Sequence, residues 1–451
     1  MDILGSNEKH ETNKNSALPK SSRLEKSHYH IPVGWILVID GASHFLYYLG
    51  TMKRIYETLI GEHFAENRQM VFLSGARQVG KTTAAFASLP EARYFNYDDT
   101  DDAAVIIGGA KRVAAELNVS TPAIERHEVV FDEIHKYPRW KNFLKGFFDS
   151  YGNGRRIIVT GSARLAVYRR GGDSLMGRYF PFTVHPISVR EATEASVDLE
   201  NIFQKPVHVT ANAIETLLEF GGFPEPFLKA NKRFYNNWQT TRREQLFRED
   251  LRDLSRVHDV RQIQVLSELL AARVGSQTTQ ASLANELRVK GDTVKMWIGL
   301  LESLYVCFQV PPWSKNVANS LRKQPKIYLW DWSVVADEGA KRENFVASHL
   351  LKAVHWWNAC GLGEFGLYYL RDKQKREVDF LVVHDKKPFM MVEVKSSSHN
   401  RINPSIEHFQ KTLKAPHAFQ LAFDMPSSDI NPAKLQTPAI ISVADLLKVL
   451  V

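Results

Sequence analysis

A glycine-rich loop between an apolar segment and a helix constrains the fold of this 451-residue chain more than any other feature. The loop SGARQVGKTT (residues 74–83) follows the apolar residues VFL, and a helix-compatible stretch continues from the loop until Pro90. The loop glycines let the backbone wrap closely, so that consecutive N–H groups and the positive end of the helix surround a phosphate. The pattern GxxxxGK[ST] in this setting predicts a Walker A loop on a parallel α/β sheet.

The Walker A pattern assigns a role to each position of the loop. Lys81 is placed to reach the β- and γ-phosphate oxygens, and the Thr82 hydroxyl to ligate Mg²⁺. An ordinary glycine-containing turn is the alternative interpretation. The predicted nucleotide-binding residues are Gly75, Ala76, Arg77, Gln78, Val79, Gly80, Lys81, Thr82 and Thr83.

A second apolar segment, residues 128–131, ends in two carboxylates about 50 residues after the Walker A loop. Ligands of open α/β sheets bind at the carboxyl ends of the strands. Asp132 is therefore the predicted Mg²⁺ carboxylate beside Thr82, and Glu133 the predicted base that orients the attacking water. Without the upstream loop, the same pair is also typical of a solvated turn.

Two further apolar segments, residues 92–99 and 157–159, fit the same sheet. The second leads into Thr160 and Ser162, which either sense the γ-phosphate or cap the following helix. Arg178 is the candidate arginine for contacting the phosphates of the bound nucleotide or of a nucleotide on a neighbouring subunit. Other arginines compete for this role, namely Arg164, Arg169, Arg170 and Arg190.

The order of these motifs resembles the AAA-class P-loop ATPases that carry a C-terminal restriction-endonuclease-like domain, a prokaryotic family. The motifs are GARQVGKTT, YFNYDD, VVFDEIHKYPRWKNFLK, VTGSAR, MGRYFPFTVHPISVRE and EFGGFPEPF, and the resemblance covers nearly all of residues 52–451. It maps the Walker B motif onto Asp132 and Glu133. It implies ATP binding and ATP hydrolysis with Mg²⁺.

Near the C-terminus, carboxylates and a lysine recur at intervals that allow them to converge. Glu343 lies on a predicted helix, and Asp379 begins the apolar strand DFLVV. Strand alternation in MMVEVKSS places Glu393 and Lys395 on one face. Such a set can hold one Mg²⁺ or Mn²⁺, with the lysine assisting the attacking water or the negative transition state.

This constellation resembles the PD-(D/E)xK nuclease core, with Glu343 as the helical acid, Asp379 as the strand aspartate, and Glu393 with Lys395 as the ExK pair. Val378 stands where the older motif name has proline. An ion pair on a half-exposed strand is the alternative for Glu393 and Lys395. An intact constellation also allows DNA binding without cleavage.

Between these regions, residues 281–304 have the proportions of a helix-turn-helix, and the resemblance suggests a winged helix. The second helix has an apolar stripe and presents Lys295 as its one outward lysine. A recognition helix normally presents several groups that contact phosphates and bases, so a packing or relay module is favoured over a sequence reader. The predicted core stripe is Val294, Trp297, Ile298, Leu301 and Leu304.

Length and pattern together predict four segments: a disordered or dubious extension (1–51), an AAA-class ATPase domain (52–210), a helical linker with a winged-helix module (211–325) and a restriction-endonuclease-like α/β domain (326–451). Residues 1–26 in particular are expected to be disordered.

Composition limits the partners and the compartment. A formal net charge of +8 permits DNA as a partner without requiring it. Two cysteines exclude a disulfide framework, and the longest apolar run, residues 30–50, is interrupted by Asp40 and other polar residues. The expected protein is cytoplasmic and independent of a membrane. Rings are common in this ATPase class, but a monomer, a dimer and a larger homo-oligomer all remain open.

Three functions follow from the sequence. In the first, the nucleotide state of an ATPase controls a C-terminal nuclease or DNA-binding domain. The second is a non-nuclease switch or scaffold, in which ATP alters assembly and the C-terminal domain contacts DNA or protein. The third is a transcriptional regulator built on the winged helix.

Overall fold

The computed structural model describes residues 35–40, 43–48, 52–117, 128–161, 175–251, 259–314, 324–399, 401–428 and 430–451. The chain divides into two compact units, residues 1–50 and 51–451. In the first unit, β1 (Trp35–Asp40) and β2 (Ser43–Tyr48) pair as an antiparallel hairpin. The disorder predicted for residues 1–26 lies outside the described residues.

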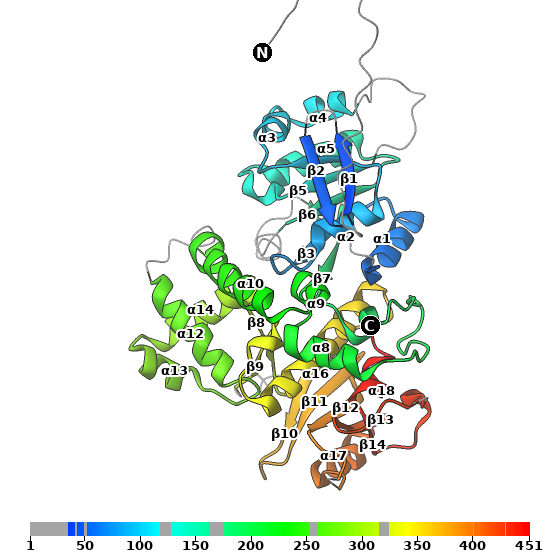
Figure 1. Cartoon of the computed structure of the whole chain (residues 1–451), viewed down its shortest axis with the longest axis vertical. Helices are drawn as coiled ribbons and strands as arrows, with labels where there is room; N and C mark the ends of the chain where they lie inside the picture. The colour runs from blue at the N-terminus through cyan, green and yellow to red at the C-terminus, as the bar shows by residue number, and fades with distance from the viewer. Residues whose placement is uncertain are drawn as a thin grey trace, which may run out of the picture. The chain divides into compact units, whose positions relative to one another are not determined.

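A parallel sheet with the strand order β4-β5-β6-β3-β7 organises the first part of the second unit (Figure 1). This confirms the α/β fold and the parallel sheet expected from the Walker A pattern. Because β6 lies between β3 and β5, the carboxyl ends of these three strands share one edge of the sheet. The strands are β3 (Met70–Gly75), β4 (Arg93–Asn96), β5 (Val129–Asp132), β6 (Ile157–Thr160) and β7 (Tyr179–Val184).

Helices cover both faces of this sheet because alternate strand residues are apolar on both sides. Val71 and Leu73 join the core beneath α1 and α2, whereas Met70 and Phe72 join the core with α5 on the other face. Helix α5 contributes Phe143, Leu144 and Phe147 to that second core. The helices are α1 (Ile55–Glu66), α2 (Lys81–Ser88), α3 (Thr100–Ile107), α4 (Ala110–Glu116), α5 (Trp140–Tyr151) and the short α7 (Val189–Ala192), with a 3-10 turn η1 (Ile134–Lys136).

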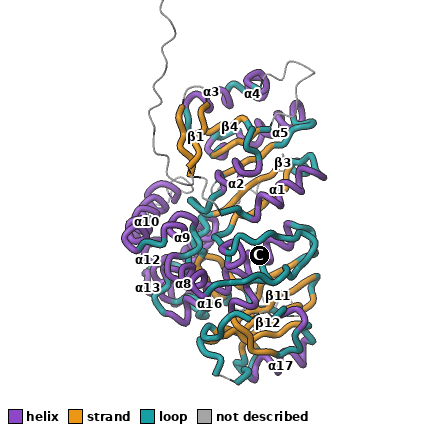
Figure 2. The backbone as a smooth tube through the Cα atoms, turned by 45° about the vertical axis from the view of Figure 1, so that its right-hand side comes forward, coloured by secondary structure: helices purple, strands orange, loops and turns teal. Residues whose placement is uncertain are grey.

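The middle of the chain is helical until an antiparallel hairpin of β8 and β9. The predicted apolar stripe of α14 is buried in full. Helices α10, α12 and α13 lie together on one side in both ribbon views (Figures 1 and 2). The elements are α8 (Ala211–Phe220), α9 (Pro224–Lys229), α10 (Lys232–Gln245), the π-helical η4 (Leu246–Asp250), α12 (Val260–Ala272), α13 (Gln280–Leu287), α14 (Gly291–Ser303), β8 (Cys307–Val310) and β9 (Lys326–Leu329).

The C-terminal part contains a mixed sheet with the order β10-β11-β12-β13-β14. Pairing is antiparallel from β10 to β12 and parallel from β12 to β14. Helix α16 packs on one face, and α17 packs on the other through Ile406 and Phe409. The elements are η5 (Trp332–Val334), α16 (Glu338–Ala359), β10 (Phe365–Arg371), β11 (Glu377–His384), β12 (Lys387–Lys395), α17 (Pro404–Leu413), β13 (His417–Ala422), η6 (Pro432–Lys434), β14 (Ala439–Ser442) and α18 (Val443–Leu447).

One apolar core runs through the whole second unit. It includes Leu73 beside the P-loop, Trp297 on α14 and Phe345 on α16. Residues 51–451 are therefore compact as a whole, and the predicted division into domains at 210 and 325 stays a prediction. Within the described part of the chain, no helix has the length and apolar character needed to cross a membrane.

Candidate nucleotide site and C-terminal carboxylate cluster

The Walker A loop leaves β3 at Gly75 and enters α2 at Lys81, as the pattern predicts. Gly75 has φ +152°, and a Cβ there would lie 2.4 Å from the carbonyl oxygen of Val184 on the neighbouring strand β7. Gly80, the residue before α2, has φ +95°. Both positions therefore require glycine because of their positive φ. Gly75 requires it also because the backbone of Val184 leaves no room for a Cβ.

Lys81 and Thr82 begin α2 at the shared edge of the sheet. The Lys81 Nζ donates to the carbonyl oxygens of Gly75 at 3.2 Å and Ala76 at 2.8 Å, so its charged end lies over the loop. The Thr82 Oγ1 donates to Asp132 Oδ2 at 3.1 Å. The structure thus brings together the two residues predicted to hold Mg²⁺, and their hydroxyl and carboxylate oxygens are ligands that Mg²⁺ prefers.

Asp132 is held by hydroxyl groups on both neighbouring strands. It accepts hydrogen bonds from the Tyr94 hydroxyl on β4 and from the Thr160 hydroxyl on β6. Thr160 is completely buried, and its hydroxyl orients this carboxylate. Tyr94 was not predicted from the sequence. It lies on β4 two residues before Asn96, and Asn96 pairs with Asp132 on the neighbouring strand. This position in a neighbouring apolar strand was the available signal. Ser162 lies outside the described residues.

Glu133 follows Asp132 with a left-handed backbone, φ +53°, which is uncommon for a residue with a side chain. Its carboxylate lies 3.7 Å from His135 Nε2 and 3.5 Å from Lys136 Nζ. Burial and the adjacent Asp132 raise the pKa of Glu133 above its ordinary value. A carboxylate with a raised pKa is better matched to accepting a proton from water near neutral pH.

Arg178 lies at the opposite end of the sheet from the Walker A loop. It directly precedes β7, whose far end pairs with Gly75, so about 20 Å of strand separates the two ends. Its guanidinium forms a bidentate ion pair with Asp149, at 2.8 and 2.9 Å. Contact with its own nucleotide is therefore out of reach, and the contact with a neighbouring subunit's nucleotide stays a prediction.

The competing arginines are not placed better. Arg190 is buried and donates to the carbonyl oxygens of Lys205 at 3.0 Å and Lys448 at 2.8 Å, so it ties chain segments together. Arg164, Arg169 and Arg170 lie outside the described residues.

A buried ionic network, not found by sequence analysis, touches the Walker A loop. Arg54, directly before α1, donates to the Val79 carbonyl oxygen in the loop at 2.9 Å and to Glu191 Oε1 on α7 at 2.7 Å. Glu191 also pairs with Lys352 of α16, and Lys352 donates to the Pro186 carbonyl oxygen at 3.0 Å. We call Arg54, Glu191 and Lys352 the bridging triad, because these residues link the loop to helix α16 in the C-terminal part of the chain.

The triad carries two cationic side chains and one anionic side chain out of contact with water. Burial alone would raise the pKa of Glu191, but Arg54 and Lys352 lower it to about 2. Burial lowers the pKa of Lys352 to about 8 although Glu191 opposes this change. Burial also lowers the pKa of the adjacent His349 to about 3, so this histidine is neutral. The neutral histidine adds no further positive charge to the network.

The C-terminal carboxylates converge as the sequence predicted. Asp379 on β11 and Glu393 on β12 are cross-linked, since Asp379 N donates to Glu393 Oε2 at 3.3 Å and Val394 N donates to Asp379 Oδ2 at 2.9 Å. Lys395 Nζ lies 2.8 Å from Glu393 Oε1. Asn403, just before α17, donates to the same oxygen at 2.6 Å. The ExK pair is thus also an ion pair, as the alternative interpretation expected.

Glu343 on α16 joins this group through a lysine that sequence analysis had not selected. Lys326, the first residue of β9, places its Nζ 3.2 Å from Glu343 Oε1 and 3.4 Å from Asp379 Oδ1. The Tyr328 hydroxyl donates to Glu343 Oε1 at 2.6 Å. Burial and Asp379 raise the pKa of Glu343 to about 7, although Lys326 opposes this shift.

The predicted Mg²⁺ or Mn²⁺ does not fit this arrangement. An ammonium group lies between Glu343 and Asp379, where the divalent ion was expected. Among the residues that the structure describes, no group of three or more His, Cys, Asp and Glu side chains is arranged to hold a metal ion.

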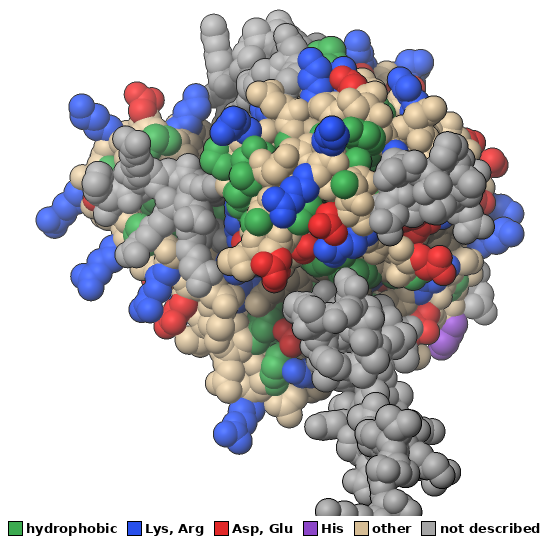
Figure 3. All heavy atoms as spheres, turned by 90° about the horizontal axis from the view of Figure 1, so that it is seen from above, with side chains coloured by type: hydrophobic (Ala, Val, Ile, Leu, Met, Phe, Trp, Pro, Cys, Tyr) green, Lys and Arg blue, Asp and Glu red, His purple; other side chains and the backbone are tan. Residues whose placement is uncertain are grey.

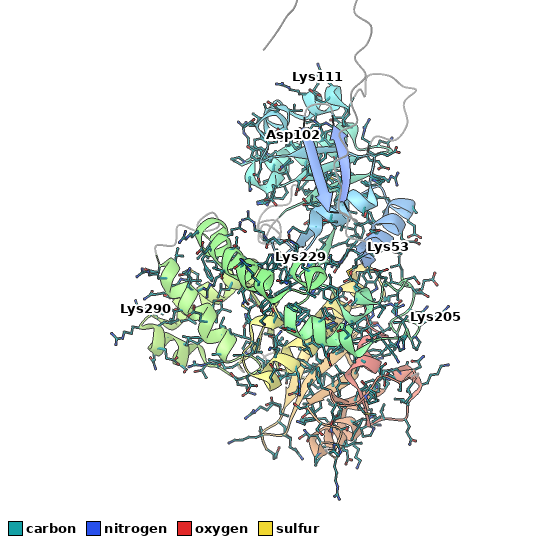
Figure 4. All side chains as sticks on the ribbon, in the orientation of Figure 1. Lys53, Asp102, Lys111, Lys205, Lys229 and Lys290 are labelled. Atoms are coloured by element: carbon teal, nitrogen blue, oxygen red, sulfur yellow. The ribbon has the colours of Figure 1, made fainter. Side chains whose placement is uncertain are left out.

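Lys295 is exposed and is the one lysine of α14, as predicted, but two further basic side chains lie in the turn before this helix. Arg288 and Lys290, before α14, are exposed together with Lys295, and Figure 4 shows Lys290 pointing away from this module into solvent. On the face shown in Figure 3, Lys and Arg side chains are spread among acidic and apolar ones. DNA contact through this module stays a prediction.

Comparison with protein families divides the chain into three matched stretches. Residues 67–193 match the AAA domain, which identifies this part as a P-loop ATPase domain and supports ATP binding. Residues 211–338 match a domain of unknown function, DUF8612, and residues 338–427 match another, DUF4143. The nuclease-like and winged-helix assignments are not among these matches.

Several curated proteins resemble the chain over most of its length. The uncharacterized protein MJ1544 of Methanocaldococcus jannaschii is 22% identical over 362 residues, which cover 75% of this chain and 78% of that protein. The uncharacterized protein Rv2008c of Mycobacterium tuberculosis is 24% identical over 355 residues, covering 75% and 72%.

Solved structures give looser likenesses. The Walker-type ATPase PABY2304 of Pyrococcus abyssi has a TM-score of 0.40 and 17% identity, covering 63% of this chain and 95% of that one. The Aeropyrum pernix ORC1 protein, solved in complex with DNA, has a TM-score of 0.33 and 14% identity, covering 66% and 95%.

Proposed function

We propose that the chain is an ATP-hydrolysing switch. Its nucleotide state controls DNA binding or DNA cleavage by the C-terminal domain, which contains Glu343, Asp379, Glu393 and Lys395. The AAA domain supports ATP binding. The observation that carries the proposal is the bridging triad, because Arg54 contacts a Walker A carbonyl while Lys352 belongs to α16, the helix that bears Glu343.

The nucleotide site contains the groups that hydrolysis needs. Lys81 would bind phosphate oxygens, and Thr82 and Asp132 would hold Mg²⁺, which would supply positive charge to offset the charge of the phosphate oxygens. Glu133 accepts a proton from the attacking water as the water oxygen bonds to the γ-phosphorus and ADP leaves. The hydroxyls of Tyr94 and Thr160 keep Asp132 in position.

The triad gives the loop a mechanical connection to the C-terminal domain. Buried ion pairs of this kind have a defined geometry, because moving one partner leaves the others unpaired in a low-dielectric interior. A shift of the Val79 carbonyl on phosphate binding displaces Arg54, then Glu191, then Lys352. The predicted domain boundaries at residues 210 and 325, and the winged-helix module predicted within residues 211–325, belong to this proposal.

A second candidate is a switch or scaffold in which the C-terminal domain binds DNA or protein without cleavage. The ammonium group of Lys326 among the carboxylates favours this candidate over active cleavage. A cleavage assay distinguishes the two candidates, with plasmid and oligonucleotide DNA, the full-length protein and Mg²⁺ or Mn²⁺. Metal-dependent cutting supports active cleavage, and its absence supports the second candidate.

The first test separates the nucleotide site from the C-terminal site. Lys81→Ala should abolish ATP binding or turnover in a radiolabelled-nucleotide assay, whereas Asp379→Ala should retain wild-type ATP hydrolysis. Equal loss of ATP hydrolysis in folded Asp379→Ala protein contradicts two separate sites.

The second part of the test follows the connection itself. A non-hydrolysable ATP analogue should change hydrogen exchange in α16 of the wild type but not of Lys81→Ala. Lys352→Met should bind the analogue but lose the response in α16. Lys341→Met is the control, because Lys341 lies on the same helix and pairs with Glu338 instead. An unchanged α16 response in Lys352→Met contradicts the proposed connection.

A further inference from the structure

Lys326 is buried beside the C-terminal carboxylate cluster, which consists of Glu343, Glu377, Asp379 and Glu393. Only 3% of its side chain is exposed. Its Nζ lies 3.2 Å from Glu343 Oε1, 2.8 Å from Glu377 Oε1 and 3.4 Å from Asp379 Oδ1. Glu377 and Asp379 are two residues apart on β11, so strand alternation places both on the face toward Lys326.

The ammonium group meets the electrostatic demand of this cluster. Buried carboxylates require a compensating charge, and an ammonium group offers three donors to surrounding oxygens. A small divalent cation would need the same oxygens at about 2.0–2.6 Å. Both cations cannot occupy this position at once.

Lys326 reaches the cluster from outside the C-terminal sheet. It lies on β9, which pairs with β8 after the helices α12 to α14. The same segment covers the cluster at two further points. A Cβ at Gly275 would lie 2.8 Å from Glu343 Oε1, and Gln277 Nε2 donates to Glu377 Oε2 at 3.2 Å.

We propose that Lys326 is a built-in cation that closes the C-terminal carboxylate site, so that a divalent cation enters only when strand β9 withdraws this lysine. The inference deepens the proposed function and rests on it for the source of the movement, but the closed state itself requires no nucleotide. Burial opposes the charge on Lys326, yet Asp379, Glu343 and Glu377 raise its pKa, so the side chain is an ammonium ion at neutral pH.

The test is Mn²⁺ binding to the full-length protein without nucleotide, followed by electron paramagnetic resonance and calorimetry. Lys326→Met should bind Mn²⁺ at least tenfold more tightly than the wild type. The gain should disappear in Lys326→Met/Asp379→Asn, which separates this site from the nucleotide site. Lys387→Met is the matched control, because Lys387 is exposed at the opposite end of β12 from Glu393, and it should bind Mn²⁺ like the wild type.

The inference is overturned if folded Lys326→Met protein binds Mn²⁺ no more tightly than the wild type does, whether or not that binding depends on Asp379. A different result separates the two proposals. If Lys326→Met binds Mn²⁺ more tightly but nucleotide does not change hydrogen exchange in α16 of the wild type, the proposed function is contradicted and the inference of a closed site is retained.

A second variant guards against misfolding, because carboxylates without their cation repel one another. Lys326→Met/Glu377→Gln removes one charge of each sign, and Mn²⁺ should raise its melting temperature but not that of Lys326→Met/Asp379→Asn. The conservative Lys326→Arg should resemble the wild type in the same assay. Equal Mn²⁺-induced shifts in both double variants also overturn the inference.

Discussion

Glu133 combines an unusual backbone with a perturbed carboxylate. Its φ of +53° turns the chain immediately after Asp132, so the two neighbouring carboxylates can take different tasks. Asp132 is surrounded by hydroxyl donors, whereas burial and Asp132 itself raise the pKa of Glu133. Two titratable groups with different environments are the usual basis of a ligand–base division of labour.

Glu133→Gln should therefore lower the ATP turnover rate by about 10²–10⁴-fold while leaving ATP affinity within a few-fold of wild type, because only proton transfer is lost. Steady-state hydrolysis and equilibrium nucleotide binding measure the two effects. Glu128→Gln is the control, since Glu128 lies before the other end of β5 and pairs with Arg156. Turnover in Glu133→Gln within threefold of wild type would remove Glu133 from the role of base.

At the scale of elements, the turn after α12 packs against the carboxylate cluster. Gly275 has φ +72° and lies against Glu343, and its amide donates to the Ile327 carbonyl oxygen next to Lys326. Gly299 on α14 is a useful contrast, because it is helical and exposed and a Cβ there would meet nothing within 4 Å.

Gly275→Ala should lower the free energy of unfolding by about 1–3 kcal/mol, because it adds backbone strain and a contact with Glu343. Gly299→Ala should instead raise it by about 0.5–1 kcal/mol through the better helix propensity of alanine. Urea denaturation of both variants provides the measurement. Equal stabilisation by both substitutions would show that the turn tolerates a side chain and does not press on Glu343.

At the scale of the whole second unit, the bridging triad joins segments that are far apart in sequence. Arg54 and Glu191 are 137 positions apart, and Glu191 and Lys352 are 161 positions apart. The shared apolar core brings these segments together, and the ionic contacts select one arrangement of them. Removing one partner of such a network leaves buried charge uncompensated.

Glu191→Gln should lower the free energy of unfolding by about 3–5 kcal/mol at pH 7. The folded-state pKa of Glu191 is about 2, below the ordinary value of 4.5, so its stabilising contribution is present above pH 4.5 and is lost as the pH falls toward 2. The gap between wild type and variant should shrink by about 3 kcal/mol across that window. Denaturation at a series of pH values tests this, and a gap that stays constant would contradict the network.

The sequence alone determined the elements whose function depends on local spacing. The Walker A residues, Asp132 and Glu133 were predictable because a glycine loop between a strand and a helix, and acids after an apolar strand, have similar geometry in any parallel sheet. The convergence of Glu343, Asp379, Glu393 and Lys395 followed from strand alternation and motif order. The buried stripe of α14 followed from helical periodicity.

Only the tertiary structure decided which distant groups meet. Arg178 lies at the far end of the sheet from the Walker A loop because β7 runs parallel to β3. Lys326 lies among Glu343, Glu377 and Asp379 because β9 packs beside α16, and Arg54 meets Glu191 across the core. Periodicity fixes which face a side chain occupies, but chain topology and packing choose its partner, and that choice closes the carboxylate cluster with an ammonium ion.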